Sequence, residues 1–484
     1  MPRLLSYLIA RRWFLRALGA IFAIAFVSLW VQIDGLIGDR GILPVGEYLA
    51  AARESLGAAA PLAVPTLFWF DASNGALHLL CGAGVAVSLA LIAGFAPALC
   101  LALLLVFYLS LVVAGQTFLG FQWDMLLLET AFFAIFLAPW QWRARADREA
   151  PVSRAGLFLL RLLLFKLMFL SGVVKLTSGD DSWWNLSALD YHYETQPIPN
   201  LLAWWMAQTP AWFKRLSTLF ALVVETVVSV GIWGPRHVRL AACALLVALQ
   251  ILIALTGNYT FFNLLAIALC LLLVDDGVFR RMPPVAAPTQ RSGARAQNFF
   301  AAFVLAVTLP LNAMVFVSAW IPRAPWPTPI AWVAATLEPF RILNGYGLFR
   351  VMTKTRPEIE IEGSDDGVNW KPYVFPWKPG PLDRAPPWVA PHQPRLDWQM
   401  WFAALSSYER NAWFARLALR LLDGEPDVLA LLEVNPFPDA PPRYLRARLY
   451  EYRFTTWAER SETGNWWNRE ELGAYLPEVS KRGP

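Results

Sequence analysis

Apolar runs close to membrane-spanning length recur along the first two-thirds of the chain and then stop. A helix needs about 20 apolar residues to cross the hydrocarbon core of a bilayer. The chain is 57% hydrophobic and only 16% charged, which is typical of a membrane protein rather than a soluble one. We predict about nine spans, over residues 17–33, 76–95, 97–113, 124–139, 157–176, 217–233, 238–256, 260–275 and 298–320.

Basic residues between the runs predict the orientation. If the N-terminus is cytosolic, fourteen arginines fall in cytosolic segments and four basic residues fall outside, in agreement with the positive-inside rule. The inside set is Arg3, Arg11, Arg12, Arg16, Arg143, Arg145, Arg148, Arg154, Arg236, Arg239, Arg280, Arg281, Arg291 and Arg295. The outside set is Arg40, Arg53, Lys214 and Arg215. The C-terminal region and residues 183–210 are then outside the cytosol, unless the runs that meet at residues 95–97 form one re-entrant unit.

The first apolar run and the net charge argue against two other interpretations of the chain. The first apolar run continues to Ile33 without a small-residue cleavage site, so we interpret it as a retained span rather than a signal peptide. The net charge of +5 is small, and the basic residues sit in short loops, so nucleic acid is not an expected partner. The expected partner is the lipid bilayer.

The composition changes near Ile321, where the long apolar runs end. Residues 358–362 alternate as in a strand, residues 364–367 form a turn signal, and residues 444–454 predict a longer strand. Residues 397–422 have apolar side chains at helical spacing, with Gly424 as a C-terminal cap. We predict a polytopic α-helical membrane domain over residues 1–320 and a soluble α+β domain with a small antiparallel sheet over residues 321–484.

Ionisable residues within the spans are functional candidates, because burying a charge in a bilayer is costly. They are Glu129, Arg161, Lys166, Lys175 and Glu225. From their depth we expect Lys175 to meet Asp124 or Glu129, and Lys166 to meet Glu225. Structural ion pairs are the favoured interpretation. The alternative is that Lys175, with Glu129 or Asp124 tuning it, is the base of a membrane enzyme.

Cofactor and metal motifs are absent from the sequence. The cysteines Cys81, Cys100, Cys243 and Cys270 lie in apolar runs without metal-binding spacing, so we expect them to be buried. His78 is expected to hydrogen-bond between helices. Asp190, His192 and Glu194 alternate in the outer loop, but no second His or Cys cluster accompanies them. Nucleophile-elbow, P-loop and dinucleotide glycine patterns are also missing, so we predict no cofactor and no metal.

Residues 179–199 carry a specific signature. Asp180, Trp184, Asp190, His192, Tyr193, Glu194, Gln196 and Pro197 belong to it. In this respect the chain resembles the lipase maturation factor family. Similar motifs follow in the same order at residues 120–130, 257–263, 344–349, 395–402 and 435–437. We expect the charged and aromatic residues of the signature to order the outer surface.

The resemblance implies an integral membrane protein with a C-terminal domain in the lumen or periplasm. In animals, the family is located in the endoplasmic reticulum membrane and helps secreted lipases to fold and assemble. It implies a secreted client protein, by resemblance a lipase, bound by the soluble domain. The client-binding candidates are Arg395, Asp397, Trp398 and Trp401. Arg, Ala and Pro usage is of bacterial character. We expect the inner membrane if the protein is bacterial and the endoplasmic reticulum membrane if it is eukaryotic.

A fainter likeness concerns Lys175. Residues 169–176 are similar to a helix end in vitamin K-dependent carboxylases, where a lysine is the base. Three functions are therefore open: a membrane factor for exported proteins, which we favour, an enzyme that acts on a lipid-soluble substrate, and a structural or transport-related membrane protein. Neither the client nor the oligomeric state follows from the sequence.

Overall fold

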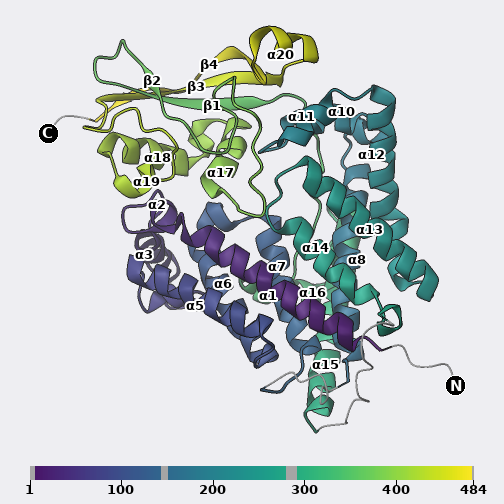
Figure 1. The fold of residues 1–484 in the computed structure, drawn as a ribbon. Helices are drawn as coiled ribbons and strands as arrows, with labels where there is room; N and C mark the ends of the chain where they lie inside the picture. The colour runs from purple at the N-terminus through teal and green to yellow at the C-terminus, as the bar shows by residue number, and fades with distance from the viewer. Residues whose placement is uncertain (1–5, 143–150, 280–291, 482–484) are drawn as a thin grey trace.

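The computed structural model describes residues 6–142, 151–279 and 292–481. Its first part is helical, and its last part is a small sheet with helical cover (Figure 1). The predicted fold class is confirmed. The principal helices are α1 (Leu8–Trp30), α5 (Asn74–Ile92), α6 (Pro97–Ala114), α7 (Gln122–Leu137), α8 (Arg154–Leu176), α12 (Ala211–Thr226), α13 (Arg236–Thr256), α14 (Phe262–Cys270) and α15 (Ser292–Trp320).

Each predicted span coincides with one of these helices, but the helices differ in length. Seven of the described helices are long and apolar enough to cross a membrane, counting α12 with the 3-10 turn η4 (Val228–Trp233). The other two predicted spans correspond to α7, with 16 residues, and to the shorter apolar helix Phe262–Leu273. The chain is therefore a multi-pass membrane protein with two helices shorter than a full span.

The helices pack through small residues and aromatic rings. A Cβ added to Gly84 of α5 would lie 2.4 Å from the ring of Phe26 in α1, so this glycine allows the two helices to approach closely. Phe26 in turn meets Tyr108 of α6 edge to face at 5.4 Å. Residues 93–96 separate α5 from α6, with Ala96 in the left-handed region at φ 36°. The predicted runs on either side of residues 95–97 are thus two distinct helices.

Short elements connect the long helices. They are α2 (Ile33–Ile37), α3 (Val45–Leu56), η1 (Gly57–Ala59), α4 (Ala60–Ala63), η2 (Leu67–Trp69), η3 (Gln116–Leu119), α9 (Asp181–Trp184), α10 (Ala188–Thr195), α11 (Leu201–Ala207), η5 (Leu271–Leu273), η6 (Asp276–Val278), α16 (Thr328–Leu337) and η7 (Glu338–Phe340). His78 of α5 contacts two other helices, as expected. Trp30 Nε1 of α1 donates to its Nδ1 at 2.6 Å, and Asp34 of α2 is 2.9 Å from its Nε2. The four cysteines are buried.

The C-terminal region contains a four-stranded antiparallel sheet in the order β2-β1-β3-β4. The strands are β1 (Pro357–Ser364), β2 (Lys371–Pro372), β3 (Tyr444–Phe454) and β4 (Trp467–Ser480), and the helices are α17 (Arg395–Ala404), η8 (Tyr408–Arg410), α18 (Ala412–Asp423), α19 (Pro426–Leu429) and α20 (Trp457–Thr463). The central pair is regular, with Ile361 opposite Ala447. Gly424 caps α18 in the left-handed conformation at φ 69°, as predicted.

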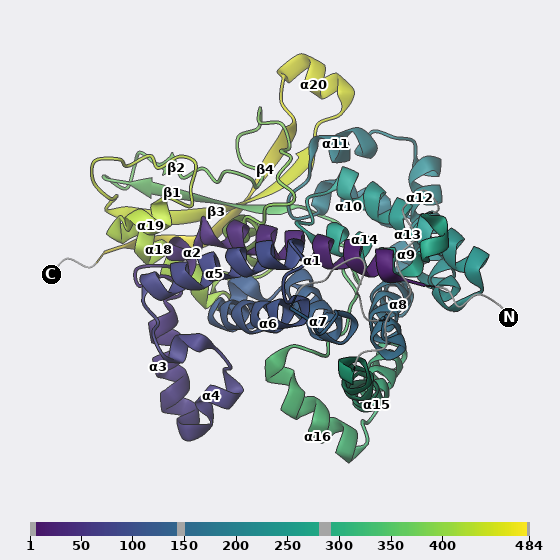
Figure 2. The same ribbon diagram turned by 60° about the horizontal axis from the view of Figure 1, so that its bottom comes forward.

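The helices α17, α18 and α19 form a layer between the sheet and the membrane helices (Figure 1). Figure 2 shows the sheet along one side of the helical part, with α15 and α16 on the other. The contact is close, since a Cβ on Gly35 of α2 would lie 2.3 Å from the carbonyl oxygen of Asp427 in α19. The chain therefore folds back so that its last third rests on its first.

Candidate functional site

The signature segment begins at Asp180, which links two distant parts of the chain. Its carboxylate accepts the backbone N–H of Ser182 at 2.9 Å, which caps α9, and that of Met352 at 2.6 Å. Burial alone would raise the pKa of Asp180, but the two backbone N–H groups lower it below the usual value. The signature is thus fixed to the irregular segment that leads into β1 of the sheet.

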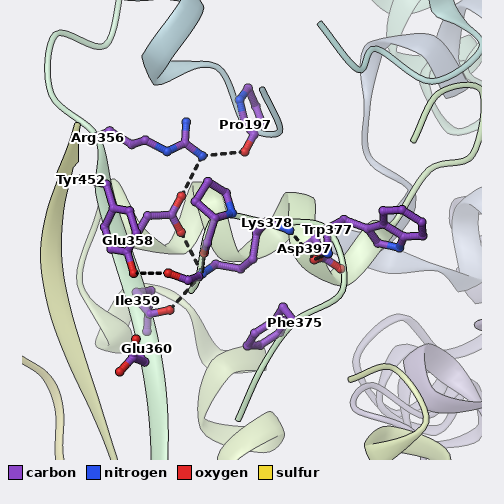
Figure 3. Close-up of polar contacts among 12 residues, drawn as sticks. Pro197, Arg356, Glu358, Ile359, Glu360, Phe375, Trp377, Lys378, Asp397 and Tyr452 are labelled. Carbon is purple, nitrogen blue, oxygen red and sulfur yellow. Dashed lines mark hydrogen bonds and ion pairs between the residues drawn. The ribbon is translucent and has the colours of Figure 1, made fainter. Parts of the chain in front are cut away.

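Arg356 is the centre of the junction between the signature and the sheet (Figure 3). This fully buried guanidinium donates to the carbonyl oxygens of Glu194 at 2.6 Å, Gln196 at 2.5 Å and Pro197 at 2.9 Å. It also pairs with Glu358 of β1 at 2.7 Å. Burial lowers the pKa of Arg356, and Glu358 opposes that shift. One side chain therefore binds the C-terminal carbonyls of α10, which helix geometry leaves without partners.

The network continues from Glu358 into α17. Lys378 lies 2.9 Å from Glu358. The carboxylate of Asp397 accepts the backbone N–H groups of Trp377 at 2.9 Å and Lys378 at 2.8 Å (Figure 3). Burial raises the pKa of Asp397 to about 6. Asp397 therefore fixes the loop that carries Lys378 over the end of the sheet.

The charged residues of the membrane helices form pairs other than those we expected. Asp124 binds Arg395 of α17, with nitrogen–oxygen distances of 2.9 and 3.0 Å, and accepts a hydrogen bond from Tyr108. Glu129 pairs with Lys166 and accepts a 2.6 Å bond from Tyr346. The expectations that Lys175 meets Asp124 or Glu129, and that Lys166 meets Glu225, are wrong.

Lys175 instead pairs with Glu225. Its Nζ lies 2.6 Å from both carboxylate oxygens and 4.9 Å from the centre of the Trp183 ring. A cavity of about 110 Å³ adjoins this pair and is also lined by His192 of the signature. The ammonium and the carboxylate therefore lie together at the edge of a cavity, where they neutralise each other.

Most signature residues lie inside the junction rather than on a surface. His192 and Gln196 both contact the hydroxyl of Tyr259, at 3.0 and 2.8 Å. Burial, with a smaller effect of the Lys175 charge, lowers the pKa of His192 to about 3. Glu194 accepts the backbone N–H of Phe454 at 2.7 Å. The side chain of Tyr193 is buried with Tyr452, Phe454 and Trp467.

Some signature residues remain accessible. The side chain of Trp184 is 67% exposed, although its indole donates to the carbonyl of Leu176 at 3.1 Å. Asp190 is partly exposed and pairs with Lys214 of α12 at 3.1 Å. The expected outer surface is thus limited to the exposed Trp184 and the partly exposed Asp190, His192 and Glu194, whereas Asp180, Tyr193, Gln196 and Pro197 are buried.

The four client-binding candidates are also buried. Arg395, Asp397, Trp398 and Trp401 have exposed fractions of 0, 2, 3 and 7%. Trp401 donates its indole N–H to the carbonyl of Thr195 at 2.9 Å. Client binding would require an exposed face here, but the membrane helices and the signature cover it, because α17 lies between the sheet and the helical part. These residues position the C-terminal region rather than presenting a surface.

Sequence reasoning missed Arg356, Glu358 and Lys378 as functional residues. Glu358 was noted only as the start of an alternating strand, and nothing in the sequence distinguished Arg356 from surface arginines. Tyr346 was missed as well, and its place in the motif at residues 344–349 was the sequence signal that could have identified it. Within the described ranges, the structure contains no cluster of three or more His, Cys, Asp or Glu side chains that could bind a metal.

Comparisons with known proteins agree with this two-part arrangement. The family models for the lipase maturation factor transmembrane domain and C-terminal domain match residues 9–281 and 342–477. The chain is 38% identical to lipase maturation factor 2 of Gallus gallus, over 98% of the chain and 82% of that protein. It is 36% identical to lipase maturation factor 2 of Homo sapiens (98% and 83%). It is 34% identical to lipase maturation factor 1 of Mus musculus (98% and 87%). No solved structure matches the chain.

Proposed function

The chain belongs to the lipase maturation factor family, and we propose that it assists the folding, assembly or maturation of exported proteins. The names of its relatives make a lipase the first client to test. We propose a cytosolic N-terminus and a C-terminal region outside the cytosol, in the inner membrane of a bacterium or the endoplasmic reticulum membrane of a eukaryote. The excess of arginine in the inner segments supports this orientation.

The rigid attachment of the C-terminal region to the membrane helices carries the proposal. Asp124–Arg395 and Glu129–Tyr346 join the two parts through buried side chains, and Arg356 joins the sheet to α10. Buried charged contacts of this kind are strongly disrupted when one partner is lost. A surface fixed in this way stays at a constant height above the bilayer, where an exported client emerges.

One accessible part of the C-terminal region is the sheet face turned away from α17. Its charged side chains form cross-strand pairs, Arg446–Glu362 at 2.7 Å and Arg448–Glu471 at 2.6 Å. These side chains are partly exposed, unlike the buried candidates in α17. We propose this outward sheet face as the client-binding surface, because charged, accessible side chains can exchange their partners for those of a client.

The test uses cells that lack the protein and that secrete a lipase. The measured quantity is the activity of the secreted lipase per mass of lipase protein. We expect this specific activity to fall without the protein and to recover with the wild-type chain. The double variant Arg446→Ser/Arg448→Ser should restore only part of it. Arg416→Ser is the matched control, because Arg416 is an exposed arginine of α18 that pairs with Glu47 at 2.5 Å. Full activity in cells without the protein would contradict the proposal.

The enzyme alternative makes a different prediction. A base must be free to approach its substrate, whereas Nζ of Lys175 lies 2.6 Å from both carboxylate oxygens of Glu225. The geometry thus favours a structural pair. The neutral double variant Lys175→Met/Glu225→Gln avoids an unpaired buried charge and removes any base. If it restores lipase maturation, the enzyme alternative fails; if it is folded and inactive, membrane chemistry replaces our proposal.

A further inference from the structure

A groove of about 480 Å³ opens on the side of the helical part, between two segments that do not span the membrane. One wall comes from residues 60–70, which include α4 and η2, and another from residues 328–340, which form α16 and η7. The floor comes from Val106 and Leu109 of α6 and from Phe132 of α7. Figure 2 shows α4 and α16 projecting on the same side of the helical part, away from the sheet.

The depth of the groove places it within the thickness of the bilayer. One end of α6 and of α7 faces the C-terminal region, where Arg395 of α17 binds Asp124 of α7 and the carbonyl of Phe118 just after α6. From these ends, the groove floor reaches nine residues along α6, to Leu105, and ten along α7, to Phe132. A rise of about 1.5 Å per residue makes this about 15 Å, half of a hydrocarbon core of about 30 Å. The groove is therefore level with the leaflet on the side of the C-terminal region.

The helix α16 has a surface suited to hydrocarbon rather than to water. None of its ten described residues is charged or buried, and the side chain of Trp332 is 70% exposed. The hydroxyl of Thr336 donates to the carbonyl of Trp332 at 2.9 Å, within the helix. Contiguous exposed apolar surfaces mark contacts with membranes or partners. At about 15 Å in length, α16 is too short to cross a bilayer but fits within one leaflet.

The other wall has an irregular backbone whose polar groups find partners within the protein. The N–H of Leu67 donates to the hydroxyl of Ser110 in α6 at 3.1 Å, and the hydroxyl of Thr66 donates to the Ser110 carbonyl at 3.1 Å. The indole of Trp69 donates to the carbonyl of Val64 at 2.8 Å. Two prolines in this segment have no N–H group. Irregular backbone is tolerated at membrane depth only where it is satisfied in this way.

We propose that residues 60–70 and 328–340 are embedded in this leaflet, and that the groove between them holds acyl chains of its phospholipids. The described residues that line the groove include no charged side chain, and their hydroxyl and indole groups are already paired. An acyl chain needs no hydrogen-bond partner, whereas an extended peptide would leave its N–H and C=O groups unpaired there. Val106 is also 45% exposed on α6, so the groove is continuous with the surface of a membrane span.

Site-directed spin labelling of the full-length protein in phosphatidylcholine nanodiscs tests the embedding. Leu62→Cys and Trp332→Cys put one nitroxide on each segment, at positions 73 and 70% exposed, where substitution should leave the fold intact. The four native cysteines are buried, and labelling of the wild type measures their background. The two collision probes are oxygen, which concentrates in hydrocarbon, and a water-soluble nickel chelate. We expect both labels to collide more with oxygen, at a depth of at least about 5 Å.

The matched control is Val368→Cys, an apolar position that is 78% exposed in the loop between β1 and β2. Its label should collide more with the nickel chelate than with oxygen. A label at Trp332→Cys that is as accessible to the chelate as the control would overturn the proposal. A label that neither probe reaches would show that a second copy or a client covers α16, and would overturn it equally.

Photolabelling tests whether the groove is occupied. A phosphatidylcholine with a diazirine midway along one acyl chain should label residues 337–342, as located by mass spectrometry. Val106→Trp fills the groove from α6 and should lower this labelling about three- to tenfold. Leu103→Trp is the control, because Leu103 is exposed on the same helix but does not line the groove. Undiminished labelling in a Val106→Trp variant with the wild-type melting temperature would refute the occupancy.

Discussion

We expect loss of the ion pair between Asp124 and Arg395 to lower the stability of the protein the most. Both side chains are fully buried, and Arg395 also donates to the carbonyl of Phe118 at 2.8 Å. Arg395→Met leaves the Asp124 carboxylate without its cation, which costs about 3–5 kcal/mol. We expect a clear fall in the melting temperature of the detergent-solubilised protein. The double variant Asp124→Leu/Arg395→Met should recover part of the loss, and equal melting temperatures for the single variant and the wild type would contradict this account.

Asp397 gives the stability of the C-terminal region a defined pH dependence. Burial raises its pKa from 3.8 to about 6. Between these values the unfolded chain releases a proton that the folded chain keeps, so the contribution of Asp397 is largest below pH 3.8 and falls as the pH rises through 6. The difference amounts to about 3 kcal/mol. Asp397→Asn keeps an oxygen for the N–H groups of Trp377 and Lys378 but does not titrate.

Melting temperatures of the wild type and of Asp397→Asn, measured from pH 4 to pH 7, test this prediction. The wild type should lose stability relative to the variant as the pH rises. Burial lowers the pKa of His392 to about 4, so its contribution to stability changes with pH in the opposite direction. Both proteins contain His392, so the comparison between them cancels this contribution. A difference between the two proteins that stays constant with pH would show that Asp397 is ionised in the folded state at pH 4.

The sequence identified which residues carry charge in the membrane but not which of them meet. The depth of Glu225 was counted from a span that begins at residue 217, whereas α12 begins at Ala211. The 14 residues from there to Glu225 rise about 21 Å, so α12 extends well beyond the end of α8, and Glu225 reaches Lys175 rather than Lys166. Helix position along the membrane normal depends on tertiary packing, which hydropathy does not encode.

At the scale of helices, Gly172 sets the distance between α8 and α12. A Cβ at this position would lie 2.4 Å from Cγ2 of Thr226 and 3.1 Å from Cβ of Glu225. We expect Gly172→Ala to force the helices apart, to strain the Lys175–Glu225 pair and to lower the melting temperature. Gly46→Ala is the control, since Gly46 lies in α3 with nothing within 4 Å of an added Cβ. Similar melting temperatures for the two variants would refute the packing role.

The strand β3 shows what periodicity predicts and what it misses. Its location was predicted from the alternation of residues 444–454, and strict alternation would bury the same face along the whole strand. In the structure, Leu445 and Ala447 are buried in the first half and Tyr452 and Phe454 in the second. The buried face changes because α17 and α18 cover one face at one end, while α11 covers the other face near α20 (Figure 1). Alternation identifies a strand but not which partner covers each face.

The amino-acid composition changes at residue 320, but residues on the two sides of this boundary pack against each other. After α15 the chain returns to the membrane helices before it enters the sheet: Tyr346 binds Glu129, and a Cβ on Gly347 would lie 2.3 Å from Val174. The hydropathy of residues 321–356 gave no sign of this contact. Composition alone divides the chain into two domains, whereas in the structure buried ion pairs join them.

This arrangement predicts that residues 1–320 and 321–484 do not fold separately. Without the second fragment, Asp124 loses Arg395 and Glu129 loses Tyr346; without the first, Arg356 loses the carbonyls of the signature segment. Each loss removes one partner from a buried polar group at a cost of about 1–3 kcal/mol, and several such losses are comparable with the usual stability of a domain, about 5–15 kcal/mol. We expect each fragment alone to aggregate or to be degraded, and the two expressed together to co-purify as one complex. Detergent size-exclusion chromatography distinguishes these results. A monodisperse 1–320 fragment with the wild-type melting temperature would show that the membrane domain folds independently, and that truncation is a clean test of the soluble region.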